Sequence, residues 1–175
     1  MIEALGLTKR FNEFVAVNDL SFRAEAGQIY AILGPNGSGK STTMRMLLGL
    51  LKPTAGTARI AGHDLRTNMV EAKRLMGYVP EEPVLPERLT GWEYANYVSD
   101  IWRVPRGTKR DEEIEELMKL LDIMDASDDL IETYSKGMSR KISLVAALIH
   151  RPKVLILDEV QAGIDPRGAV TIKSI

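Results

Sequence analysis

The clearest chemical pattern in the sequence is a glycine-rich run that satisfies the spacing G-x-x-x-x-G-K-S/T, namely Gly34-Pro35-Asn36-Gly37-Ser38-Gly39-Lys40-Ser41, followed by Thr42. Glycines let backbone N–H groups converge on phosphate oxygens without a side chain in the way. A helix that begins at Lys40–Ser41 would direct the positive end of its dipole at the same anion. Lys40 supplies a mobile charge for the β- and γ-phosphates, and the Ser41 hydroxyl can bind Mg²⁺. The run therefore predicts a phosphate-binding loop.

A pair of acidic residues, Asp158 and Glu159, follows the apolar run Val154–Leu157. Nucleotide hydrolysis requires an Asp that holds Mg²⁺ and a group that orients the attacking water. Taken alone, such a pair most often marks a turn after a strand. Together with the phosphate loop upstream, it predicts the metal and water side of a nucleotide-hydrolysing site.

These residues need an α/β framework to position them, and the apolar patterning predicts one. Expected strands cover 2–7, 15–22, 29–33, 57–60, 76–79 and 154–157, the last as a strand buried on both faces. A helix is expected from Ser41, with further helices around 94–101 and 114–121 and from near Lys136 to residue 149. The helical stretch 81–150 therefore has the pattern of an insertion into an α/β core.

Composition excludes several classes of function. The 175 residues have a net charge of −1 and a pI of about 6.2, which argues against electrostatic wrapping of nucleic acid. The sequence has no cysteine and two histidines, so it offers no disulfide, no thiolate metal site and little histidine for a metal centre. No apolar stretch approaches the roughly 20 residues that span a bilayer, and no secretory signal opens the chain. The expected compartment is the cytoplasm.

Further motifs appear in a fixed order: the aromatic Phe11, the apolar Val17, the run Tyr134-Ser135-Lys136-Gly137-Met138 and the run Gly163-Ile164-Asp165-Pro166. With the phosphate loop and 154–159, they make the chain resemble the ATP-binding subunit of an ABC transporter, of the exporter-like ABC-2 type, over essentially its whole length. The resemblance implies an α/β P-loop NTPase fold with a RecA-like core, an antiparallel β subdomain and an inserted helical subdomain. It implies one nucleotide-binding domain over 1–175, with its core at 1–80 and 151–175 and its helical subdomain at 81–150.

The resemblance also implies roles for individual residues. Phe11 would stack on adenine, Val17 would contact the nucleoside, and Gly34–Thr42 would hold the phosphates. Glu159 and Lys40 would be catalytic, while Ser41, Asp158 and Glu81 would bind Mg²⁺. The residues that would contact the ATP of a second subunit are Ser135, Lys136, Gly137 and Met138, with Gly163 and Asp165 in the D-loop. The expected partners are a second ATP-binding subunit and a membrane permease at the inner face of the cell membrane, with no nucleic acid.

The sequence departs from the family pattern at several positions. Lys136 and Met138 stand where the usual signature L-S-G-G-Q has glycine and glutamine, and Val160 replaces a proline. Glu81 replaces a glutamine, and a carboxylate cannot donate an amide hydrogen bond. The family histidine that contacts the γ-phosphate has no counterpart. His63 is expected in a turn before a helix and His150 at the end of the helix from Lys136, which are ordinary positions at the ends of elements. We therefore expect a chain truncated at its C-terminus, without its last strand or strands.

The resemblance implies a transport ATPase, which binds and hydrolyses Mg²⁺·ATP at a dimer interface to power a membrane exporter. Two alternatives to this function remain open at this point. One is a nucleotide-binding regulatory or interaction module without turnover, which the missing histidine and Glu81 favour. The other is a family member that works without a membrane partner, which a single set of motifs and the absence of heptads disfavour. The remaining patterns have plain structural interpretations: 109–113 is a mixed-charge helix start, and Trp92, Tyr94, Tyr97 and Trp102 are packing residues of the helical part.

Overall fold

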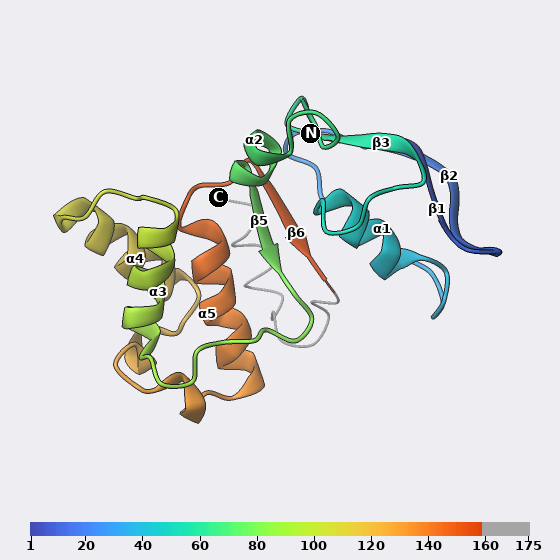
Figure 1. Cartoon of the computed structure of the whole chain (residues 1–175). Helices are drawn as coiled ribbons and strands as arrows, with labels where there is room; N and C mark the ends of the chain where they lie inside the picture. The colour runs from blue at the N-terminus through green and yellow to red at the C-terminus, as the bar shows by residue number, and fades with distance from the viewer. Residues whose placement is uncertain (159–175) are drawn as a thin grey trace. The chain divides into compact units, whose positions relative to one another are not determined.

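The computed structural model describes residues 1–158. The chain forms two compact units, one from Met1 to Met76 and one that begins at Gly77. Figure 1 shows the order of elements along the chain. Among the described residues, no helix has both the length and the apolar character needed to cross a bilayer.

The first unit contains an antiparallel sheet of four strands in the order β2-β1-β3-β4. A two-residue turn at Asn12 and Glu13 joins the first two strands, so that Phe11 pairs with Phe14; Asn12 has a positive φ of 52°. Strand β3 then pairs antiparallel with β1, with Ala4 opposite Ala58. The strands are β1 (Ile2–Phe11), β2 (Phe14–Ala24), β3 (Ala55–Ile60) and β4 (His63–Asp64).

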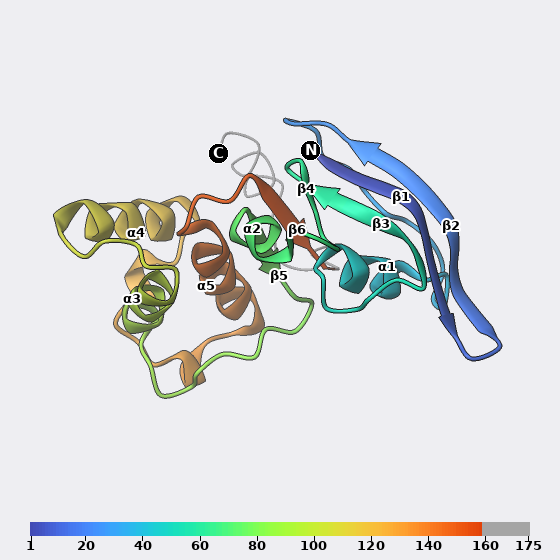
Figure 2. The ribbon, with the colours of Figure 1, turned by 45° about the horizontal axis from the view of Figure 1, so that its top comes forward.

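Helix α1 (Lys40–Leu47) packs on this sheet, as Figures 1 and 2 show. Its buried side chains are Thr43, Met46 and Leu47, while Leu7 and Ile60 are the fully buried large residues of the sheet. Alternation places one set of strand side chains on the face that the helix covers. The sheet and α1 thus form the packed support for the segment 34–42. A short helix, α2 (Met69–Arg74), follows later in this unit.

The structure corrects two expectations in this unit. The predicted strand at 29–33 is absent: no residue of this stretch belongs to a described strand, and Ile29 and Leu33 are 69% and 78% exposed. Its apolar composition favours a strand, but a strand also needs a hydrogen-bonded neighbour, and no described strand pairs with it. His63, expected in a turn, lies in β4 opposite Ile60.

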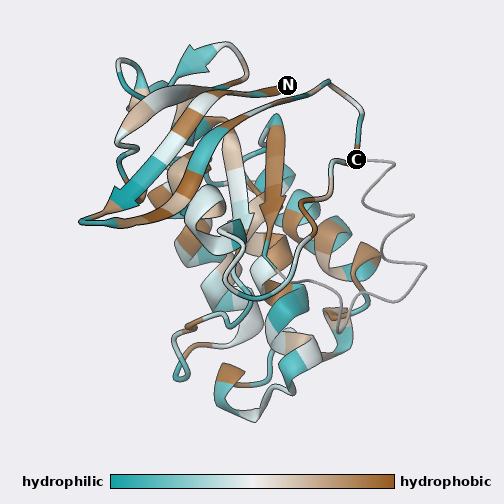
Figure 3. Cartoon of the chain, turned by 90° about the vertical axis from the view of Figure 1, so that its right-hand side faces the viewer, coloured by the Kyte–Doolittle hydropathy of each residue, from teal (hydrophilic) through white to brown (hydrophobic). Residues whose placement is uncertain are grey.

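The second unit pairs two strands that are far apart in sequence, β5 (Met76–Val79) and β6 (Val154–Leu157). The elements between them are helical, which confirms the predicted insertion. They are α3 (Gly91–Ile101), α4 (Thr108–Leu120), α5 (Lys136–Leu148) and two short 3-10 helices, η1 (Met124–Ala126) and η2 (Ile131–Thr133). Figure 3 shows β6 coloured as hydrophobic along its length. Val154 and Ile156 are buried, but Leu155 and Leu157 are only half-buried, so the prediction of a strand buried on both faces is correct for one face alone.

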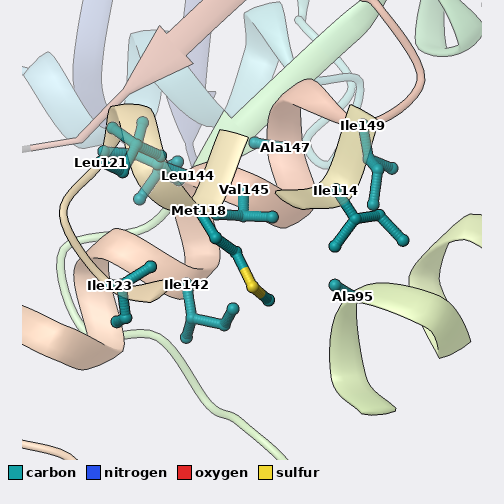
Figure 4. Packing of buried hydrophobic residues seen from close by; sticks show 11 residues of the cluster. Ala95, Ile114, Met118, Leu121, Ile123, Ile142, Leu144, Val145, Ala147 and Ile149 are labelled. Carbon is teal, nitrogen blue, oxygen red and sulfur yellow. The ribbon is translucent and has the colours of Figure 1, made fainter. Parts of the chain in front are cut away.

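The core of the second unit lies where α3, α4 and α5 meet (Figure 4). Ile114, Met118, Ile142 and Val145 are completely buried there. The apolar faces predicted for 114–121 and 142–149 are therefore confirmed as core faces. Three of the four predicted packing aromatics lie against this cluster: Trp92, Tyr94 and Trp102. The fourth, Tyr97, is instead 54% exposed.

Candidate functional site

The predicted phosphate loop leads directly into α1, which begins at Lys40, one residue before the expected start. Gly37 and Gly39 have positive φ values of 81° and 90°, which glycine adopts without strain. Helix α1 has no side-chain cap and no acidic residue in its first turn. The backbone N–H groups of Lys40, Ser41 and Thr42 have no acceptor among the described residues. This helix end is therefore electropositive and has donors available for an anion.

Gly39 lies directly against strand β2. A Cβ added at Gly39 would lie 2.5 Å from the Ala16 carbonyl oxygen and 3.1 Å from Val17 Cγ2. Only glycine fits there, so the sheet fixes where α1 begins. The contact also places Val17, the predicted nucleoside contact, beside the loop. The sequence gives no signal for this contact, because its two partners are far apart along the chain.

The Lys40 side chain folds back over the loop. Its Nζ donates to the Gly34 carbonyl at 2.8 Å and to the Pro35 carbonyl at 3.0 Å. The Ser38 N–H also donates to the Pro35 carbonyl, at 3.2 Å, which closes a turn within the run. Neutral carbonyls hold the ammonium weakly compared with an ionised phosphate, since charge-assisted hydrogen bonds are the stronger class. The two carbonyls thus keep the Lys40 ammonium at the loop, where it can exchange these partners for phosphate oxygens.

The remaining loop residues are placed as follows. Pro35, Asn36, Ser38 and Ser41 are exposed, and Thr42 is half-buried. A Cβ at Gly34 would lie 2.6 Å from Ser38 Oγ, so the loop is tight at its first glycine as well.

Phe11, the predicted adenine contact, ends strand β1 in the same unit as the loop. Phe11 is 47% exposed, which is high for a phenylalanine. The Lys9 ammonium lies 5.1 Å from the centre of its ring. The structure therefore gathers Phe11, Val17 and the phosphate loop in one compact unit.

In the second unit, Glu81 and Asp158 follow the ends of β5 and β6, at the same edge of this strand pair. Both strands run in the same direction (Figure 1), and the Asp158 N–H donates to the Val79 carbonyl at 3.0 Å. Glu81 follows β5 at this same edge, and its carbonyl accepts from Arg140 Nη2 of α5 at 3.2 Å. Asp158 and Glu81 offer carboxylate oxygens, which are donors that Mg²⁺ prefers. Glu159, Gly163 and Asp165 lie outside the described residues.

The predicted signature run begins helix α5. Ser135 is its N-cap, and Ser135 Oγ accepts from the Met138 N–H at 3.2 Å. Within the described chain, the N–H groups of Lys136 and Gly137 have no acceptor. A Cβ at Gly137 would meet only Ser135 Oγ, at 3.8 Å, so the fold itself does not require glycine at this position. This second helix end, which has no acidic residue in its first turn, is also suited to an anion.

One charged residue of the predicted mixed-charge helix start is buried. Arg110 is 6% exposed; its Nη1 donates to Asp100 Oδ1 at 2.6 Å and its Nη2 to Asn96 Oδ1. Hydrogen bonds from Arg106, the larger contribution, and from Arg110 lower the pKa of Asp100 to about 2. His150 stacks on Trp102 with 3.9 Å between ring centres. Both features lie in the helical part.

Comparison with known proteins gives a consistent result. A family model described as ABC transporter matches residues 17–162. The daunorubicin/doxorubicin resistance ATP-binding protein DrrA of Streptomyces peucetius is 40% identical over 95% of this chain and 50% of its own length. The linearmycin resistance ATP-binding protein LnrL of Bacillus subtilis (strain 168) is 34% identical over 96% of this chain and 54% of its own. The chain thus spans about half the length of each of these two relatives.

Solved structures agree with the sequence relatives. The structure of an ATP-binding subunit of an ABC transporter superposes with a TM-score of 0.86 and 27% identity, over 98% of this chain and 71% of that one. CbiO1 from Clostridium perfringens, part of the ABC transporter complex CbiONQ, superposes with a TM-score of 0.79 and 25% identity, over 98% of this chain and 70% of that one. These matches confirm the predicted α/β P-loop NTPase fold. The chain belongs to the ABC transporter family, and DrrA, LnrL and the first of these structures are ATP-binding proteins or subunits of that family.

Proposed function

We propose that this chain binds Mg²⁺·ATP and hydrolyses it at an interface between two ATP-binding subunits, and that this powers a membrane transporter of the exporter class. The observation that supports the proposal most strongly is the start of α1. Three backbone N–H groups without acceptors, a positive helix end and the Lys40 ammonium converge on one glycine-rich turn. This combination suits a chain of phosphates and little else.

Within one subunit, each part of the nucleotide has its own contacts. Phe11 stacks on the base, Val17 contacts the nucleoside, and Gly34–Thr42 surround the phosphates. Ser41, Asp158 and Glu81 hold Mg²⁺, which when bound neutralises charge that develops on the phosphoryl group. Lys40 exchanges its two carbonyl partners for oxygens of the β- and γ-phosphates.

Hydrolysis requires a base for water and a second subunit. Glu159 polarises the attacking water, as the group that follows the Mg²⁺-binding Asp158. Ser135, Lys136, Gly137 and Met138 contact the ATP of the other subunit, with Gly163 and Asp165 of the D-loop beside them. The two free N–H groups at the start of α5 and the open space around Gly137 support this role. The added charge of Lys136 favours phosphate near this helix end.

The names of the relatives suggest the class of transporter. DrrA and LnrL are both resistance ATP-binding proteins, one for daunorubicin and doxorubicin and one for linearmycin. We infer that this chain works with a permease at the cytoplasmic face of the membrane and exports a compound that the permease selects. Because ATP stabilises the closed pair of subunits better than ADP does, hydrolysis reopens it.

The test is Mg²⁺-dependent phosphate release by the wild-type chain and by Glu159→Gln. The variant should lose turnover by about 100-fold or more, because it loses the general base. It should still bind ATP and should sediment as a dimer in its presence. Glu112→Gln, at an exposed position of α4, removes a carboxylate elsewhere and should leave turnover unchanged. Unchanged turnover in Glu159→Gln would contradict the assignment.

The same assay addresses the second candidate function, a nucleotide-binding module without turnover. Glu81 favours it, because a carboxylate cannot donate the hydrogen bond that an amide would give to water. ATP binding without any Mg²⁺-dependent phosphate release in the wild-type chain would support that function over hydrolysis.

A further inference from the structure

Lys9 is the only described cation whose ammonium lies over the ring of Phe11, with 5.1 Å between Nζ and the ring centre. The same Nζ donates to the Lys52 carbonyl at 2.8 Å. The ammonium is therefore held from two sides, by a ring face and by a backbone oxygen. It is a fixed part of the surface around Phe11 rather than a freely moving surface charge.

The backbone beneath Lys9 is fixed to the same neighbouring segment. The Arg10 N–H donates to Thr54 Oγ1 at 3.0 Å, and the Thr54 N–H donates to the Thr8 carbonyl at 2.8 Å. Three hydrogen bonds thus connect residues 8–10 of β1 to residues 52–54. Since Phe11 is the next residue along the strand, its backbone position is defined as well.

These contacts leave Phe11 with two unlike ring faces. The Lys9 ammonium lies over one face, yet the residue as a whole is 47% exposed. We propose that Lys9 is a positioning residue for the nucleotide base: it holds the Phe11 ring by a cation–π contact, so that the opposite ring face stacks on adenine. This inference rests on the proposed nucleotide-binding function and adds a residue to it.

The physical basis is the orientation of one flexible side chain. A phenylalanine at the end of a strand can rotate about χ1, and a rotating ring loses entropy when a base stacks on it. A cation over one face favours a single ring orientation, so less entropy is lost on binding. Cation–π contacts at exposed sites correspond to a change of about two- to fivefold in affinity.

The test separates the base from the phosphates. Equilibrium titrations with Mg²⁺·ATP and with Mg²⁺·tripolyphosphate compare the wild-type chain with Lys9→Met. ATP should bind about two- to fivefold more weakly to the variant. Tripolyphosphate has no base and should bind equally to both proteins. Lys9→Arg retains a cation over the ring and should restore ATP affinity.

Arg10→Met is the matched control, because it removes an equal charge from the next residue of the same strand. It should leave the affinity for both ligands unchanged. Equal ATP affinity in Lys9→Met and the wild-type chain would overturn the inference. Equal weakening of ATP and tripolyphosphate would overturn it too, since it would show that Lys9 only supports the fold. If the wild-type chain bound neither ligand, the proposed function itself would fail.

Discussion

The contact between Gly39 and strand β2 allows a quantitative prediction from a pair of glycines. Gly37 and Gly39 both have positive φ, so an alanine at either position is strained by roughly 1–2 kcal/mol. Around Gly37 a new Cβ would have nothing within 4 Å, whereas at Gly39 it would lie 2.5 Å from the Ala16 carbonyl oxygen. Real Cβ atoms essentially never come closer than 3.0 Å, so α1 or β2 must move by at least half an ångström in Gly39→Ala.

The expected losses of stability follow from the backbone strain at both glycines and the steric contact at Gly39. Gly37→Ala should lower the free energy of unfolding of the first unit by about 1–2 kcal/mol, from backbone strain alone. Gly39→Ala should lower it by about 2–5 kcal/mol, because overpacking adds roughly 1–3 kcal/mol. Gly39→Ala should also weaken ATP binding by more than about tenfold, because the N–H groups at the start of α1 are displaced.

Native-state hydrogen exchange of amides in β1 and β3 measures the stability of this unit separately from the helical one. A fluorescent ATP analogue reports binding. Equal destabilisation by the two substitutions would refute the reasoning, since it would mean that the contact with Ala16 does not constrain the loop. Normal ATP affinity in Gly39→Ala would refute the second step.

Three further predictions concern the second unit. Asp100→Asn should reduce stability at neutral pH, because Arg106 and Arg110 lower the pKa of Asp100 from 3.8 to about 2. Since the pKa of Asp100 is lower in the folded state than in the unfolded state, the stabilisation is complete above about pH 4 and is lost as the pH falls toward 2. Urea titrations should therefore show that the difference in free energy of unfolding between wild type and variant shrinks as the pH falls over that interval. Ile142→Ala should lower the free energy of unfolding by about 2–5 kcal/mol, because Ile142 is completely buried. Tryptophan fluorescence measures the unfolding, and a loss below about 0.5 kcal/mol would contradict the packing in Figure 4. Thr90→Ala removes the capping box of α3 and should cost about 1 kcal/mol in the same assay, with no loss expected if the cap does not form in solution.

Local patterns predicted the elements that have strong sequence signals. The apolar run Val154–Leu157 forms β6 with the predicted bounds, and 76–79 forms β5. The phosphate loop leads into a helix within one residue of the expected start. In each case the signal lies in a few consecutive residues, such as glycines before a lysine or four apolar side chains in a row.

Features that depend on distant partners were not predictable in this way. The stretch 29–33 has the composition of a strand, but no described strand pairs with it. Composition alone does not indicate which strands pair. Arg110 belongs to a charged run that favours a solvated surface, yet Asn96 and Asp100 of another helix bury it. The carbonyl partners of Lys40 and the closeness of Val17 to Gly39 follow from how the loop folds on the sheet. Spacing could indicate which residues form the loop, but not how each is held.

The most direct test of the account is calorimetric titration of the full chain with Mg²⁺·ATP, comparing the wild type with Lys40→Met. Lys52→Met, which removes an exposed lysine of the same unit, is the control. The account predicts saturable binding by the wild-type chain and the control, and at least about tenfold weaker binding by Lys40→Met, because a charge-assisted contact to phosphate is lost. Absence of ATP binding by the wild-type chain, or equal affinity in Lys40→Met, would contradict the central claim that this loop is a nucleotide site.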